Sequence, residues 1–142
     1  MMVLNGELLV FASAVVVVGL AIFIAISMTR KSTVALDKEA YQTDFLKIEN
    51  TLTKDNELSF NHVVVEADKL LDRAMLELKV QGKTMGDRLK AGKDKFSQLN
   101  AVWYAHKLRN KIAHEHRFQL EYNQARHALT TYRQALKDLG AI

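Results

Sequence analysis

The sequence contains no cysteine and no proline among its 142 residues. Without cysteine the chain can form no disulfide and no thiolate zinc site, which excludes zinc ribbons, zinc knuckles and thiol enzymes. Without proline, helices are spared their main internal breaker, and an all-β fold would lack one of its usual turn residues. The length suits one compact domain with an anchor rather than two full domains. The expectation is therefore an all-α protein.

One long run lacks charge altogether: residues 8–28 are 21 residues rich in Val, Ile, Ala, Leu and Phe. At about 1.5 Å per residue a helix here is roughly 30 Å long, the thickness of a bilayer's hydrocarbon core. A cleaved signal would have a basic start and a shorter apolar run, and a buried core helix would keep a polar face. We expect a short N-terminal segment at 1–7 and, at 8–28, one transmembrane helix in contact with the lipid bilayer.

The charges that flank this run predict its orientation. Glu7 precedes it, whereas Arg30 and Lys31 follow it directly. The positive-inside rule then places the N-terminus outside and the C-terminal domain in the cytoplasm, at a plasma or inner membrane.

Apolar residues recur with helical spacing through the rest of the chain. In 29–57, Tyr41, Phe45, Ile48 and Leu52 are spaced by four, three and four, which predicts an amphipathic juxtamembrane stalk helix that ends in a polar break. Residues 58–142 are expected to form a small antiparallel helical bundle, with helices over 60–78, from Thr84 to near Gly92, over 97–113 and over 118–139. The last has a heptad-like seam, for packing within the bundle or in a homodimer.

Positive charge is concentrated in residues 83–117, which hold nine of the 20 Lys and Arg residues and only three acids. Such a cluster suits an anionic partner: RNA, DNA or a lipid headgroup. A solvated basic face is the alternative interpretation. The candidate anion-binding residues are Lys107, Lys111, His116 and Arg117.

Arg109 and His114 form the most chemically suggestive pair. A guanidinium can hold a phosphate through two hydrogen bonds, and an imidazole can move a proton near neutral pH. Five positions on a straight helix separate the two side chains by about 140° around the axis. They can converge only if the helix ends between them or if two copies face each other.

The run WYAHKLRNKIAHE, residues 103–115, resembles the signature of HEPN domains (higher eukaryotes and prokaryotes nucleotide-binding). The resemblance implies a HEPN-like helical bundle. Active members of that family are metal-independent endoribonucleases that use the RNA 2′-hydroxyl and often assemble the site across a dimer. On this resemblance Arg109 would bind and polarise the phosphate, His114 would act as acid or base, and Asn110 would have an orienting role at the site. Many relatives instead serve as binding or scaffold modules.

Three functions follow as hypotheses: a membrane-tethered ribonuclease, a non-catalytic module that binds RNA, a nucleotide or a protein, and an oligomerising module that touches anionic lipid. No cofactor or metal is expected. The run from His114 to Phe118 begins like a zincin motif but has Phe118 where the second histidine ligand belongs. His106 is interpreted as a core or edge histidine and Trp103 as core.

Overall fold

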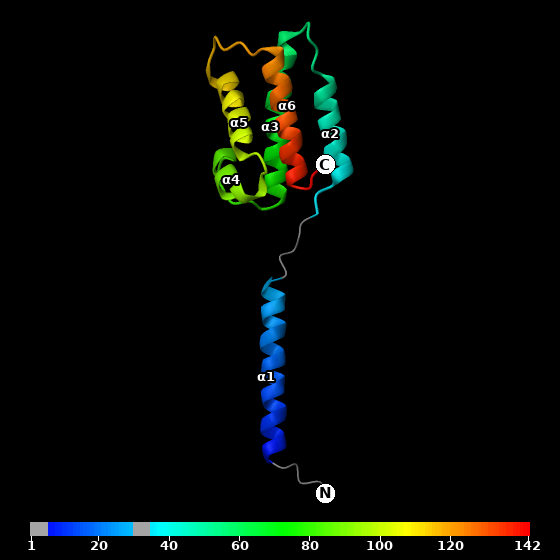
Figure 1. The fold of residues 1–142 in the computed structure, drawn as a ribbon, viewed down its shortest axis with the longest axis vertical. Helices are drawn as coiled ribbons and strands as arrows, with labels where there is room; N and C mark the ends of the chain where they lie inside the picture. Colours follow the sequence, from blue (N-terminus) through cyan, green and yellow to red (C-terminus); the bar gives the residue numbers. More distant parts are fainter. Residues whose placement is uncertain (1–5, 30–34) are drawn as a thin grey trace. The chain divides into compact units, whose positions relative to one another are not determined.

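A computed structural model of the chain describes residues 6–29 and 35–142 (Figure 1). These residues form helices and no strand, which confirms the predicted all-helical class. The elements are, in chain order, α1 (Gly6–Thr29), α2 (Lys38–Asn50), α3 (Glu57–Glu77), α4 (Met85–Ala91), the 3-10 turn η1 (Lys93–Lys95), α5 (Leu99–His114) and α6 (Tyr122–Asp138). The chain divides into two compact units, Met1–Thr33 and Val34–Ile142.

Helix α1 is apolar on every side, and its stretch Gly6–Ser27 is long and apolar enough to cross a membrane. Large apolar side chains such as Phe11 and Phe23 are about 70% exposed. The predicted apolar helix at 8–28 is therefore present. Arg30 and Lys31, on which the predicted orientation depends, lie outside the described residues.

The second unit is a bundle whose central helix is α3. Figure 1 shows that α2, α3, α5 and α6 run in alternating directions, and α3 packs against the other three. Its apolar residues recur every three or four positions and so line one wide face. They are almost fully buried: Val63, Val64, Ala67, Leu70, Leu71 and Ala74. This face, with the seams of α5 and α6, forms the core.

Helix α2 differs from the expected stalk, because it belongs to the bundle. Its apolar stripe is buried against the core, with Tyr41 and Phe45 at most 2% exposed. Arg73 of α3 fixes α2 further: it bonds the Asp44 carboxylate at 2.8 Å and lies over the Tyr41 ring. The compact unit consequently begins at Val34 rather than at residue 58.

The short helix α4 is stabilised by a capping box at its own N-terminus and by an ion pair with α3. Thr84 and Asp87 form the predicted capping box, which satisfies free N–H groups at the start of the helix. Arg88 is buried and donates to both Asp72 carboxylate oxygens and to the Gly82 carbonyl. Gly82 has a φ of 148°, and a Cβ there would lie 2.6 Å from the backbone nitrogen of Arg88, so only glycine fits. The Arg88 contacts place α4 beside α3.

The last helix begins at Tyr122 rather than at Phe118. Glu121 and Gln124 form a capping box that starts α6 four residues later than the apolar spacing suggested. Phe118 still packs at the edge of the core, but from the irregular segment that precedes the helix.

Candidate functional site

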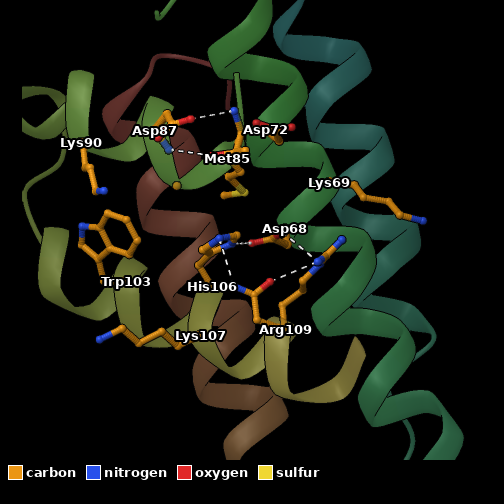
Figure 2. A pocket seen from close by; sticks show the side chains of 13 residues that line it. Asp68, Lys69, Asp72, Met85, Asp87, Lys90, Trp103, His106, Lys107 and Arg109 are labelled. Carbon is orange, nitrogen blue, oxygen red and sulfur yellow. Dashed lines mark hydrogen bonds and ion pairs between the residues drawn. The ribbon is translucent and has the colours of Figure 1, made fainter. Parts of the chain in front are cut away.

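A pocket of about 630 Å³ lies between α3, α4 and α5, and Figure 2 shows the side chains that surround it. Helix α3 contributes Asp68, Lys69 and Asp72 to its lining, and the α4 region contributes residues from Thr84 to Lys90. The remaining lining residues are Trp103, His106, Lys107, Arg109 and Asn110, all on α5. A concave space of this size, with apolar and polar walls, suits a small ligand.

The floor of the pocket is organised by one buried carboxylate, that of Asp68, which is 3% exposed. Its Oδ1 accepts hydrogen bonds from the Tyr132 hydroxyl at 2.9 Å and from His106 Nδ1 at 3.0 Å. Because a carboxylate only accepts hydrogen bonds, His106 Nδ1 is the donor in this contact. Helices α3, α5 and α6 meet at this group.

Asn110 and Arg109 close these contacts into a ring. The Asn110 amide nitrogen lies 3.4 Å from His106 Nε2, and its oxygen accepts from Arg109 Nη1 at 3.1 Å. Nε of Arg109 then lies 3.5 Å from Asp68 Oδ2, as an ion pair rather than a hydrogen bond. The guanidinium is therefore held at two of its three nitrogens, Nε by Asp68 and Nη1 by Asn110. Within the described part of the chain, Nη2 of Arg109 has no hydrogen-bond acceptor.

Burial raises the pKa of Tyr132 well above its usual value, and the negative charge of Asp68 raises it further. The phenol therefore stays protonated near neutral pH and remains a donor to Asp68.

Two of the three acids that line the pocket are paired with arginines, Asp72 with Arg88 and Asp68 with Arg109. The third, Asp87, stays ionised, because hydrogen bonds from Thr84 lower its pKa. Some bases of the pocket have no ion-pair partner among the described residues. Lys69 pairs with Glu66 on the surface of α3. Lys107, by contrast, is exposed and forms no ion pair with any residue in 6–29 or 35–142. The pocket consequently offers positive charge to an anion.

Trp103 forms the aromatic wall of the pocket (Figure 2). It is half-buried, and its ring edge would lie 3.6 Å from a Cβ at Gly86 of α4. His106 meets it edge-on, with ring centroids 6.1 Å apart. Trp103 packs beside the core as predicted, but it also lines the pocket.

The structure separates the residues that the sequence motif grouped. Arg109, Asn110 and Lys107 line the pocket, whereas His114 does not. His114 is exposed and is the last residue of α5, so the helix does not end between Arg109 and His114. The two side chains therefore diverge within one chain, and only the second route to convergence, two facing copies, stays open. Lys111, His116 and Arg117 are exposed outside the pocket.

Three residues of the network were not predicted as site residues: Asp68, His106 and Tyr132. His106 was interpreted as a core or edge histidine, and it is indeed buried and hydrogen-bonded, but it also faces the pocket. No group of three His, Asp or Glu side chains with metal-site geometry occurs within 6–29 and 35–142.

Comparison of the chain with protein-family models, with curated proteins and with solved structures gives no match. The interpretation of the pocket therefore depends on its own chemistry.

Proposed function

We propose that this chain is a membrane-anchored helical module that binds a phosphate-bearing ligand, RNA or a nucleotide, in the pocket between α3, α4 and α5. One observation carries the proposal: Arg109 lines the pocket with its guanidinium held at Nε by Asp68 and at Nη1 by Asn110, and Nη2 has no acceptor among the described residues. A guanidinium so oriented can bind an oxyanion without first losing side-chain freedom.

Two further features support a phosphate ligand. Lys107 stands at the same pocket without an ion-pair partner in the described residues, so it can add charge to the site. The segment 103–115, which resembles HEPN domains, also supplies every α5 residue of the pocket.

The anchor and its orientation belong to the same proposal. Helix α1 would span the membrane, and the bundle would lie in the cytoplasm because Arg30 and Lys31 follow the span. A reporter protein that fluoresces only in the cytoplasm, fused after Ile142, should fluoresce in the membrane fraction. A dark fusion, or fluorescence in the soluble fraction alone, would contradict this orientation or the anchor.

The binding proposal is tested with the full chain in detergent micelles and a labelled short RNA or nucleotide. Arg109→Ala should weaken binding about tenfold or more, because a charge-assisted hydrogen bond is lost. The matched control is Arg126→Ala, an exposed arginine of α6 that lies outside the pocket. Equal loss in both variants would mean that only general positive charge matters, and equal binding by Arg109→Ala and wild type would overturn the proposal.

A second candidate is a metal-independent endoribonuclease assembled across a homodimer. The observation that favours it is the exposure of His114, whose side chain makes no hydrogen bond with any described residue and so is accessible to a second copy. RNA cleavage would be measured in EDTA for wild type, Arg109→Ala, His114→Ala and a mixture of the two variants. Cleavage by wild type, loss in each variant and partial recovery in the mixture are expected of a shared site. Cleavage that is the same in all samples, or absent from wild type, would reject this candidate.

A further inference from the structure

Trp103 places an aromatic surface in the pocket that a bare phosphate would not use. The side chain is half-buried rather than enclosed, and it lines the same space as Arg109. Its ring edge packs against Gly86 of α4 and against His106, which hold the indole in place. A held, accessible indole in a pocket with a positive side is typical of sites that stack a nucleobase.

The pocket extends along α5 from Trp103 to Asn110. Trp103, His106, Lys107 and Asn110 recur every three or four residues and so share one face of the helix. Asn110, which orients Arg109, lies seven residues after Trp103, or roughly 10 Å along the axis. A ligand that contacts both Trp103 and Arg109 must therefore extend over about two turns of the helix.

The volume of the pocket argues for a small ligand rather than a long strand. About 630 Å³ lies within the range of roughly 300–1,000 Å³ that is usual for small-molecule sites. Figure 2 shows Lys90 and Lys107 on the Trp103 side and Lys69 on the Arg109 side. The aromatic wall and the fixed guanidinium therefore stand at different positions in one bounded space.

We infer that the pocket binds a nucleoside monophosphate, with its base stacked on Trp103 and its phosphate on Arg109. The inference rests on the proposed function and narrows its ligand from any phosphate carrier to a single nucleotide. The base makes the contact with Trp103 that a sugar phosphate cannot make. Comparing a nucleotide with a sugar phosphate therefore distinguishes this inference from the proposed function.

The chain offers a direct probe, because Trp103 is its only tryptophan. Full-length protein in detergent micelles would be titrated with AMP, UMP and ribose 5-phosphate, with calorimetry for affinity and tryptophan fluorescence for the contact. Both nucleotides should change the fluorescence and bind about tenfold or more tightly than ribose 5-phosphate. Ribose 5-phosphate should bind without a comparable change in fluorescence.

Trp103→Leu should reduce nucleotide affinity about tenfold or more and leave that for ribose 5-phosphate unchanged. Trp103→Phe should retain part of the affinity. The matched control is Tyr104→Leu, since Tyr104 is an exposed aromatic residue of the same helix outside the pocket. If Trp103→Leu does not fold, Gly86→Leu serves instead, because its side chain would extend toward the Trp103 ring from a helical position and should weaken nucleotide binding selectively.

The outcomes distinguish the two proposals. If neither nucleotides nor ribose 5-phosphate bind, and labelled RNA does not bind either, the proposed function and this inference fail together. If ribose 5-phosphate binds as tightly as AMP, or if Trp103→Leu binds AMP like wild type, only the stacking inference is overturned. Binding of a short RNA without binding of either nucleotide would also overturn the stacking inference, because the ligand would then be an RNA strand rather than a single nucleotide.

Discussion

Helix α5 carries two histidines, His106 and His114, in opposite surroundings. His106 is buried, shares the Asp68 carboxylate with Tyr132 and lies beside Asn110 in the pocket. His114 ends the helix and is exposed, and its side chain has no hydrogen-bond partner within the described ranges. Arg109 lies between them in sequence but shares a network only with His106. The pocket therefore uses the histidine three residues before the arginine, and the histidine of the motif is left for a second copy or for solvent.

Asp68→Ala should have the largest effect of the variants predicted here, because the buried contacts of His106 depend on the Asp68 carboxylate. Asp68→Ala removes the acceptor for His106 and Tyr132 and leaves the partly buried charge of Arg109 without its carboxylate. Breaking a buried polar network of this kind costs about 3–5 kcal/mol of unfolding free energy. Urea denaturation of the full chain in micelles, followed by circular dichroism, measures the loss.

The matched control is Glu66→Ala, two residues earlier on α3. Glu66 pairs with Lys69 at the surface, so its removal should cost less than about 1 kcal/mol. Similar losses for the two variants would mean that the buried ring contributes no more than an exposed pair does.

His106→Ala is expected to have the second largest effect. It leaves a cavity at a buried position and removes one hydrogen bond from Asp68 and one from Asn110. A loss of about 2 kcal/mol follows. The variant should also bind the phosphate ligand several-fold more weakly, because Asn110 then orients Arg109 less firmly. Retention of wild-type affinity after correction for folding would show that the ring has no part in orienting Arg109.

Tyr132→Phe should destabilise the same network less than the previous variants. It should also change how the free energy of unfolding depends on pH. Losing the hydroxyl should cost about 1 kcal/mol near neutral pH. Because burial and Asp68 raise the pKa of Tyr132 in the folded state, the unfolded chain releases this proton first as pH rises. Wild-type stability should therefore be intact below pH of about 10 and fall above it.

The alkaline fall should be smaller in Tyr132→Phe than in wild type. Part of it should persist, because burial also raises the pKa of Tyr41. The control is Tyr104→Phe, in which an exposed hydroxyl is removed and the wild-type pH profile is expected. Identical alkaline profiles for wild type and Tyr132→Phe would contradict the assignment.

Sequence periodicity predicted most of the helices because each buries a stripe that repeats every three or four residues. It could not predict the contacts of Asp68, since His106 and Tyr132 lie 38 and 64 residues away. One local signal was present: Asp68 interrupts the apolar face of α3 between Ala67 and Leu71, both fully buried. A carboxylate at such a position indicates a buried partner, although its identity needs the tertiary structure.

Spacing along one helix also limited the site prediction. The motif places Arg109, Asn110 and His114 within six residues, but side chains five positions apart point about 140° away from each other. The pocket instead gathers residues at helical spacing, Trp103, His106, Lys107 and Asn110, and closes against α3 and α4. Helix α2 could not be assigned to the bundle from sequence because a stalk and a bundle helix can have the same apolar stripe.

The smallest expected effect belongs to His114→Ala, which tests the exposed end of α5. An exposed side chain without hydrogen bonds should change the unfolding free energy by less than about 0.5 kcal/mol. Affinity for the phosphate ligand should stay at the wild-type value, because His114 does not line the pocket. Denaturation and binding measured on the same preparation check both statements. A clear loss of binding with intact folding would place His114 at the ligand, which one chain cannot do in this geometry, and would therefore indicate a site completed by a second copy.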